Sequence, residues 1–253
     1  MHLMPRIHRA GEGLITPPAD GGGMDAREKA EEIGTRLRAM ADPRDAAGMA
    51  RFGIRASNVL GVPVARLRPL AKEIGKDHRL ALAMWELDIH EARMLAALVD
   101  DPKQVTEEQM EAWVRDFDTW DICDACCGQL FDRTPWAFLK AREWPSREEE
   151  FVRRAGFALM ASLAVHDKKA PDRQFLELLP LVAAGASDDR NFVKKAVNWA
   201  LRQIGKRNAE LNKAAIACAE EIKGQGSRSA RWIAGDALRE LRGEAVQARL
   251  SRR

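Results

Sequence analysis

The chain of 253 residues contains no tyrosine, only four cysteines and five histidines, and few consecutive β-branched residues. Three of the four cysteines fall within residues 123–127, so they do not form the evenly spread disulfide framework of a small secreted protein. The longest apolar runs, such as residues 94–99, are far shorter than the ~18 residues that span a bilayer. With no signal-peptide pattern either, we expect a soluble protein of the reducing cytoplasm.

The composition favours a helical protein. Apolar residues make up 46% and charged residues 31% of the chain, and alanine, leucine, arginine and glutamate are abundant, which favours helix over strand. The charge is unevenly distributed, because residues 190–253 hold 15 basic and 6 acidic side chains, whereas the remainder holds 26 basic and 32 acidic ones. A basic end of this kind attracts polyanions such as nucleic acid, although basic segments also simply keep proteins in solution.

The chain divides into three parts by composition. Residues 1–23 combine Pro-Pro and Gly-Gly-Gly without helical periodicity, which predicts a flexible leader. Between residues 24 and 243, stretches with helical periodicity alternate with short breaks, as expected for a single helical domain. Asp25 is the expected cap of the first helix. Residues 244–253 are predicted to form a basic tail.

Two segments repeat one motif at an offset of 41 residues. SREEEFVRRAGFAL (146–159) aligns with SDDRNFVKKAVNWAL (187–201), and SARWIAGDAL (229–238) is a weaker third copy. Helical pairs of about 40 residues are typical of HEAT repeats, which bury their apolar faces by stacking on their neighbours. We therefore predict an all-α, HEAT-like helical-repeat solenoid, or α-α superhelix. Because the second helix of each clear copy carries a basic dipeptide, we expect a concave basic cleft that binds DNA.

The stretch DTWDICDACC (118–127) concentrates the most distinctive side chains of the chain. If a helix begins after Asp118 or Thr119, Trp120 and Asp124 lie four residues apart on one helical face. From this spacing alone two interpretations are open. The indole and the carboxylate act together at a site, or Trp120 anchors the core and Asp124 is solvated.

The three cysteines of this stretch, Cys123, Cys126 and Cys127, permit a metal site, a redox site or simple packing. A zinc site needs four ligands, and no second CxxC pair or histidine cluster is nearby in the sequence. Nothing in the sequence predicts an activated thiolate either. We therefore expect these cysteines to pack between helices and to bind no metal.

Five stretches, at residues 49–74, 84–97, 118–127, 151–159 and 192–208, together resemble the DNA alkylation repair enzyme family in their order and spacing. Members of that family are bacterial HEAT-like-repeat DNA glycosylases that remove N3- and N7-alkylated purines. The resemblance covers about residues 28–240, which is nearly the whole chain without its leader.

In that family, a Trp-x3-Asp pair, an Arg before Ala and a Trp in a K-A-x-x-W segment line the cleft. Trp120, Asp124, Arg154 and Trp199 match these positions. The resemblance implies that Asp124 stabilises positive charge developing on the deoxyribose, while Trp120 and Trp199 hold the cationic nucleotide. Arg154 is then expected to bind a phosphate beside the lesion. Phe52 follows MAR where the family can place an aromatic residue, so a tyrosine hydroxyl is missing there.

Further basic side chains are expected to contact the DNA backbone without regard to sequence, unless they only form a solvated helix face. These are Arg153, Lys194, Lys195, Arg202, Lys206 and Arg207. The resemblance implies double-stranded DNA containing alkylated purines as the partner. We expect a monomer with no metal, organic cofactor, membrane or obligate protein partner.

Three functions compete at this stage. The first is a monofunctional alkylpurine DNA glycosylase, and the second is a non-catalytic protein of the same fold that recognises distorted or branched DNA. The third is a HEAT scaffold for a protein partner. The basic end of the chain argues against the scaffold, and the complete set of Trp, Asp, Arg and Trp favours the enzyme.

Overall fold

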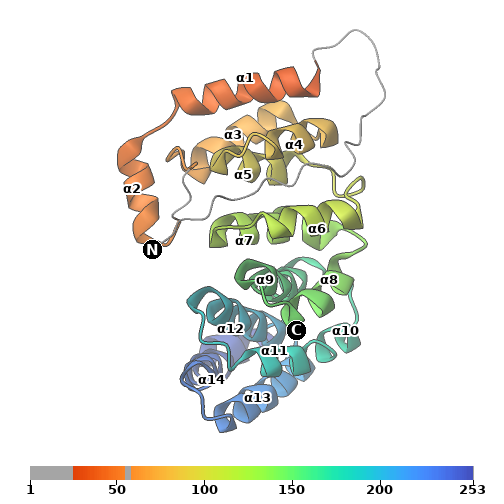
Figure 1. Ribbon diagram of the computed structural model, residues 1–253. Helices are drawn as coiled ribbons and strands as arrows, with labels where there is room; N and C mark the ends of the chain where they lie inside the picture. Colours follow the sequence, from red (N-terminus) through yellow and green to blue (C-terminus); the bar gives the residue numbers. More distant parts are fainter. Residues whose placement is uncertain (1–24, 55–57, 253) are drawn as a thin grey trace.

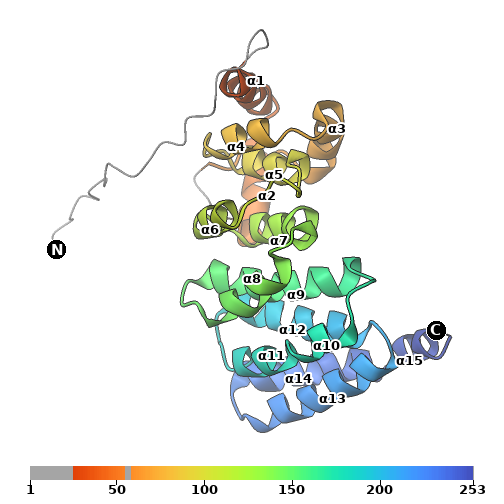
Figure 2. The same ribbon diagram turned by 90° about the vertical axis from the view of Figure 1, so that its right-hand side faces the viewer.

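The computed structural model describes residues 25–54 and 58–252, and every regular element within those ranges is a helix (Figures 1 and 2). The leader predicted over residues 1–23 lies outside them. The N-terminal helices are α1 (Ala26–Ala39), α2 (Pro43–Arg51), α3 (Val64–Ile74), α4 (His78–Trp85), α5 (His90–Val99), α6 (Glu107–Arg115) and α7 (Trp120–Gln129). After them come η1 (Phe131–Arg133), α8 (Ala137–Glu143), η2 (Trp144–Ser146), α9 (Glu150–His166), α10 (Asp172–Leu176), α11 (Leu179–Gly185), α12 (Asn191–Gly205), α13 (Ala209–Gly224), α14 (Arg228–Leu241) and α15 (Glu244–Leu250).

The helices stack in pairs, as the repeat pattern predicts. Helix α4 packs on α5, α8 on α9, α11 on α12 and α13 on α14. The later helices of the pairs form a continuous row, in which α5 contacts α7, α7 contacts α9, α9 contacts α12 and α12 contacts α14. Helices α9 and α12 begin at Glu150 and Asn191, at the predicted offset of 41 residues. The equivalent rings of Phe151 and Phe192 lie 5.5 Å apart. The all-α repeat fold is therefore confirmed.

Helix α9 is the centre of the molecule. All residues from 154 to 164 are buried, so the helix has almost no solvent-exposed face. A helix that is apolar on all sides must be covered on all sides. Helices α7, α8 and α12 provide that cover. Polar side chains on α9 are therefore fixed in place by packing, and Arg154 is one of these side chains.

Several helix starts follow ordinary capping chemistry. The side chains of Asp42, Asp77, Thr106 and Asn208 each accept a hydrogen bond from a backbone N–H in the first turn that follows. Asp25 occupies the predicted cap position of α1, but its side chain makes no capping hydrogen bond. The sequence expectation was wrong on that point, and α1 begins without the usual side-chain acceptor.

The predicted basic tail contains a further helix. Residues 244–250 form α15, whose Val246 and Leu250 are buried. Helix α15 packs on α14, so most of this segment continues the helical stack. Among the described helices, none combines the length and the apolar character needed to cross a membrane.

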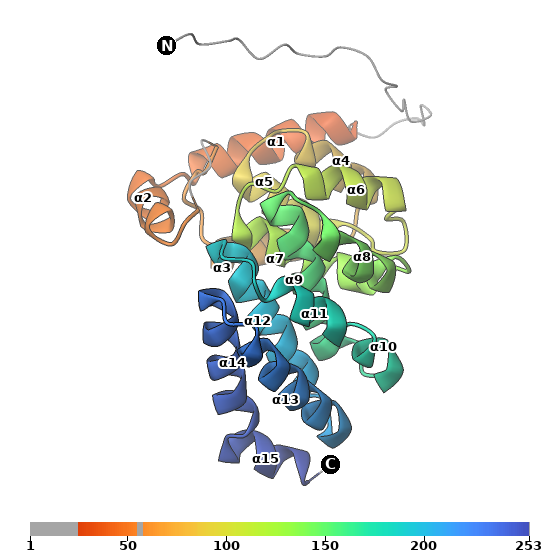
Figure 3. The ribbon, with the colours of Figure 1, turned by 60° about the horizontal axis from the view of Figure 1, so that its bottom comes forward.

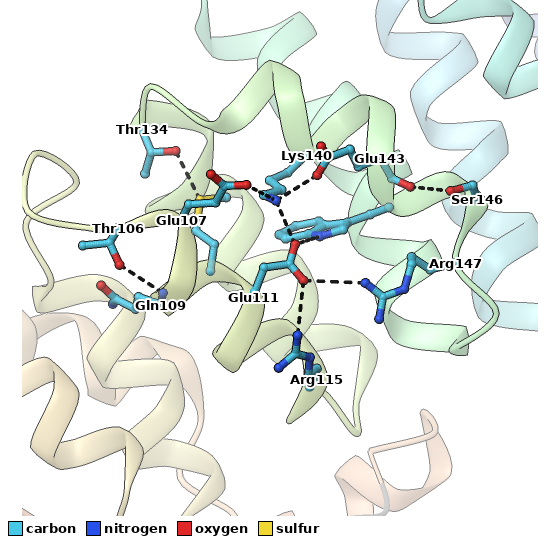
Figure 4. A network of polar contacts seen from close by, with 12 residues as sticks. Thr106, Glu107, Gln109, Glu111, Arg115, Thr134, Lys140, Glu143, Ser146 and Arg147 are labelled. Atoms are coloured by element: carbon cyan, nitrogen blue, oxygen red, sulfur yellow. Dashed lines mark hydrogen bonds and ion pairs between the residues drawn. The ribbon is translucent and has the colours of Figure 1, made fainter. Parts of the chain in front are cut away.

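A buried lysine ties α6 to α8 (Figure 4). The Lys140 side chain is 3% exposed, and its Nζ lies 2.7 to 2.9 Å from carboxylate oxygens of Glu107, Glu111 and Glu143. Trp144 Nε1 also donates to Glu111, at 2.8 Å. Burial disfavours the charge on Lys140, but its hydrogen bonds to the three glutamates outweigh burial and raise its pKa. Burial likewise opposes the charge on Glu111, but the hydrogen bonds from Trp144 and Lys140 lower its pKa.

Lys140→Met is expected to lower the free energy of unfolding by about 3 kcal/mol, because it removes the cation that three carboxylates share. The midpoint of urea unfolding measures this loss. The contribution of Lys140 is full below its ordinary pKa of 10.5 and is lost as pH rises through its higher folded value. That of Glu111 is full above 4.5 and is lost as pH falls through its lower folded pKa.

Lys213→Ala is the matched control, because Lys213 is 74% exposed and pairs only with the exposed Glu210. It should change the free energy of unfolding by less than about 0.5 kcal/mol. Equal unfolding midpoints for the Lys140 and Lys213 variants would show that the Lys140 network does not stabilise the fold.

Candidate functional site

One cavity of about 330 Å³ lies where three neighbouring helices of the row meet the end of α2. Helices α7, α9 and α12 supply most of its walls, and the residue after α2 supplies the rest. The lining residues are Phe52, Trp120, Asp124, Arg154, Phe192, Lys195 and Trp199. The four side chains that matched the family pattern span 79 positions of the chain, from Trp120 to Trp199. All four line this one cavity.

A bidentate ion pair forms the polar side of the cavity. Arg154 donates from Nε to Asp124 Oδ1 at 3.0 Å and from Nη2 to Asp124 Oδ2 at 2.7 Å. Its Nη1 donates to the backbone carbonyl of Phe192 at 2.6 Å. The Arg154 side chain is 6% exposed, whereas 22% of the Asp124 side chain remains exposed. Arg154 is thus buried behind the carboxylate, and the carboxylate faces the cavity.

This geometry changes the role expected for Arg154. A phosphate contact needs a guanidinium that solvent can reach, but all three nitrogens of Arg154 already donate to protein oxygens. Fork-to-fork pairing with a carboxylate fixes both partners in orientation. Arg154 is therefore placed to hold Asp124 rather than to bind DNA directly.

The pair also sets the ionisation of the site. Burial raises the pKa of Asp124, and the charge and hydrogen bonds of Arg154 offset only part of that rise. On Arg154, burial is the largest influence and disfavours the charged form, but the charge and hydrogen bonds of Asp124, together with the nearby cysteines, outweigh it and raise the pKa. Asp124 is therefore a carboxylate in a poorly hydrated place, where its charge acts strongly on nearby groups.

Aromatic side chains form the other walls. Trp120 and Trp199 are half-buried, and Trp120 Nε1 donates to the backbone carbonyl of Phe52 at 3.0 Å. The Phe52 ring itself is 75% exposed. Gly53 follows with φ of +89°, and a Cβ at that position would lie 2.9 Å from Phe192 Cζ. A residue with a side chain there would be strained and would collide, so Gly53 lets the end of α2 approach α12 closely.

Few of the basic residues predicted to contact DNA line this cavity. Of the six basic residues expected to contact the DNA backbone, only Lys195 lines the cavity, and its side chain is exposed. Arg153 donates to the carbonyl of Pro145 and pairs with Asp188. Within the described part of the chain, three of the six expected DNA-contacting side chains form ion pairs with acids.

Two of these basic residues pair with one acid on α14. Arg202 and Lys206 both contact Glu240. Arg207 instead donates to the carbonyls of Ala164 and Asp167 at the end of α9, where it serves the fold. Helix neighbours thus supply acceptors that the linear sequence does not reveal, and contact of these side chains with DNA stays a prediction.

The cysteines pack between helices. Cys123, Cys126 and Cys127 are free and fully buried, and Cys127 Sγ donates to the carbonyl of Ala155 on α9. Burial raises the pKa of Cys126 and Cys127 well above the ordinary value, which keeps them protonated. Among the described residues, no three His, Cys, Asp or Glu side chains are grouped to hold a metal ion.

Phe192 is the site residue that sequence reasoning missed. Its carbonyl accepts from Arg154, and its ring lines the cavity. A signal for it exists, because Phe192 is the repeat equivalent of Phe151, one residue after the start of α12. The repeated position predicts that the Phe192 ring packs, but it does not predict that the Phe192 carbonyl accepts a hydrogen bond from Arg154.

A helical-repeat solenoid with an aromatic cavity around a bidentate Asp–Arg pair is the class of protein that this fold and site define. The DNA alkylation repair enzyme family model matches residues 33–241, and the chain belongs to this family. The chain is also 21% identical over 196 residues to the uncharacterized protein Lin0241 of Listeria innocua. That match covers 76% of this chain and 85% of the relative.

A solved structure has the same fold. It is described as a member of "a new family of proteins related to the HEAT-like repeat DNA glycosylases with affinity for branched DNA structures". It superposes with a TM-score of 0.70 at 19% sequence identity, over 90% of this chain and 96% of that one. At this identity the likeness establishes the HEAT-like repeat fold.

Proposed function

We propose that this protein is a DNA glycosylase that hydrolyses the N-glycosidic bond of cationic N3- and N7-alkylated purines in duplex DNA. The observation that carries the proposal is the Asp124 carboxylate, which Arg154 holds in place at an aromatic-walled cavity. We propose further that it acts in the cytoplasm as a monomer without a metal or organic cofactor.

The chemistry suits this set of side chains. An N3- or N7-alkylpurine carries a positive charge, so the C1′–N bond can break with its electron pair leaving on the purine, without a strong general acid. Positive charge then develops on the deoxyribose, and a carboxylate in a poorly hydrated site stabilises it. Water adds to C1′ and loses a proton, which leaves an abasic site and a free base. Asp124 is the charge stabiliser in this scheme and can orient the water.

Trp120 and Trp199 hold the cationic nucleotide. An indole face attracts a cation by roughly 0.5 to 2 kcal/mol, depending on exposure. The cavity, at about 330 Å³, is at the small end of the range for ligand sites. It can hold a sugar or a base, but it is too small to enclose and read a whole nucleotide. Discrimination then comes mainly from the charge and lability of the lesion itself.

Release of a free base tests the proposal directly. Purified protein is incubated with methylated duplex DNA, and 7-methylguanine and 3-methyladenine in the supernatant are quantified by mass spectrometry. We expect release well above the spontaneous rate, with abasic sites formed in equal number. Release at the spontaneous rate by protein that binds the DNA would contradict an enzymatic role.

A non-catalytic DNA-binding role is the second candidate. The structural relative described above is reported to have affinity for branched DNA, and Phe52 lacks the hydroxyl of a tyrosine. In that case forked or four-way DNA binds more tightly than intact duplex, and no base is released. Binding to neither DNA would favour the third function, a scaffold for a protein partner.

Lys195 is the basic residue at the cavity that is best placed for a phosphate, so Lys195→Ala should weaken binding to every duplex. Each phosphate contact contributes roughly one counterion, so the slope of log K against log salt should fall by about 0.9. Fluorescence anisotropy between 50 and 200 mM salt measures it. Lys213→Ala, on α13, is the control and should leave the slope unchanged. An unchanged slope for Lys195→Ala would place Lys195 off the interface.

A further inference from the structure

Side chains of α12 face α14 at every fourth position, and each has a partner there. Three of these contacts join positions 38 residues apart, which keeps the two helices in register. The pairs, in order along α12, are Lys194 with Trp232, Asn198 with Asp236, and both Arg202 and Lys206 with Glu240. Three of these four side chains therefore contact a carboxylate, Lys206 from the cap position directly after α12.

The first pair breaks this pattern. Lys194 Nζ lies 5.2 Å from the centre of the Trp232 ring, where the other positions have an acid. Within residues 25–54 and 58–252, Lys194 forms no ion pair. Trp232 is 43% exposed, and Phe52 is the only other aromatic side chain of the described residues with such exposure. An unneutralised cation and an exposed indole thus lie together on the surface.

The surface beside Trp232 is open. Gly235 lies three residues further along α14, on the same side of the helix, and is exposed. A Cβ added to Gly235 would meet no atom within 4 Å, so packing does not require a glycine there. Glycine is among the least favourable residues inside a helix. Its presence leaves the helix surface open one turn beyond Trp232.

This surface adjoins the cavity. Lys195, which lines the cavity, is the neighbour of Lys194 on α12. Helices α12 and α14 lie side by side and contact each other (Figure 3). Trp199 lines the cavity from α12, and Trp232 lies on α14, the helix packed against it.

We propose that Trp232, Lys194 and the open surface at Gly235 bind one unpaired nucleotide of the DNA strand next to the cavity. The inference rests on the DNA binding proposed above, but not on catalysis. An indole stacks on the face of any base, and a neighbouring lysine suits the adjoining phosphate. A base inside a duplex already has both faces covered by its neighbours, so the partner of Trp232 must be unpaired.

The test compares two probes that differ only in a bulge of two unpaired nucleotides. Fluorescein-labelled 25-base-pair duplex and the same duplex with a two-nucleotide bulge are titrated with wild-type protein and with Trp232→Ala. Stacking on one base predicts that Trp232→Ala weakens binding to the bulged probe by about 10-fold or more. Binding to the intact duplex should change less than 2-fold. Trp232→Phe, which keeps a stacking ring, should recover most of the affinity for the bulge.

A second variant does not depend on removing the indole. A Cβ at Gly235 meets no atom within 4 Å, so Gly235→Leu should keep the fold, while its longer side chain takes up surface beside Trp232 and should weaken binding to the bulged probe by a similar factor. Leu176→Ala is the matched surface control, because Leu176 on α10 is also 43% exposed. It should leave both affinities unchanged.

The outcomes separate this inference from the proposed function. Equal losses on both probes, or no loss on the bulged probe with either variant, would overturn the inference while DNA binding stands. If wild-type protein binds neither probe, the proposed function fails first. Absence of base release with a preserved bulge effect would instead support the DNA-binding candidate and leave the inference intact.

Discussion

Asp124→Asn is expected to lower the single-turnover rate of 7-methylguanine release by on the order of 100-fold or more. The amide keeps the volume of the side chain but removes the negative charge that faces the developing sugar cation. Because that cation exists only in the transition state, the loss should appear in the rate and hardly in the Kd for DNA. Removing a negative charge beside phosphates should even tighten binding slightly.

The structure adds a cost that the sequence does not show. Arg154 is buried, and in Asp124→Asn it would face an amide that offers only one acceptor oxygen. We therefore expect the free energy of unfolding to fall by about 2 kcal/mol as well. Rates should be compared at a temperature where circular dichroism shows both proteins folded. A wild-type rate of release by Asp124→Asn would make Asp124 structural and assign the chemistry elsewhere.

Arg154→Met has the second largest expected effect. It removes the partner of a largely buried carboxylate, which is expected to lower the free energy of unfolding by about 3 kcal/mol. The charge and hydrogen bonds of Arg154 now hold down the pKa of Asp124 against burial, so in the variant that pKa should rise further. If catalysis needs the ionised carboxylate, the acid limb of the pH–rate profile must then move to higher pH.

The pH profile separates positioning from mere stability. A variant that is only less stable loses rate at all pH values alike, whereas a shift of the acid limb reports on Asp124 itself. The double variant Asp124→Asn with Arg154→Met closes the thermodynamic cycle. It should be more stable than the sum of the two single changes predicts, because neither charge is then left alone. Additive losses would mean that the two side chains do not stabilise each other.

Local features of the chain predicted the helices and their repeat. Helical periodicity and turn residues act over a few positions, so the sequence alone reveals them. The offset of 41 between the two clear copies reappears as the starts of α9 and α12. The expected cap at Asp25 failed because a cap depends on the rotamer of one side chain, which the sequence does not determine.

The sequence indicated which residues line the cavity, but not which side chains pair with one another. Trp120 and Asp124 share a helical face because of their spacing, and both line the cavity. Arg153 and Arg154 are adjacent and look equivalent in the sequence, yet successive residues of a helix point about 100° apart. Arg154 therefore reaches Asp124, while Arg153 reaches Asp188.

The sequence by itself determined that the chain is an all-helical repeat protein and which aromatic and acidic residues belong to its distinctive motifs, because both follow from local spacing. Only the tertiary structure decided which basic side chains are left without an ion pair and can contact DNA. Ionic pairing depends on which helices become neighbours, and those contacts join residues some 30 to 40 positions apart. They bury Arg154 behind Asp124, pair Arg202 with Glu240, and leave Lys195 at the cavity and Lys194 beside Trp232.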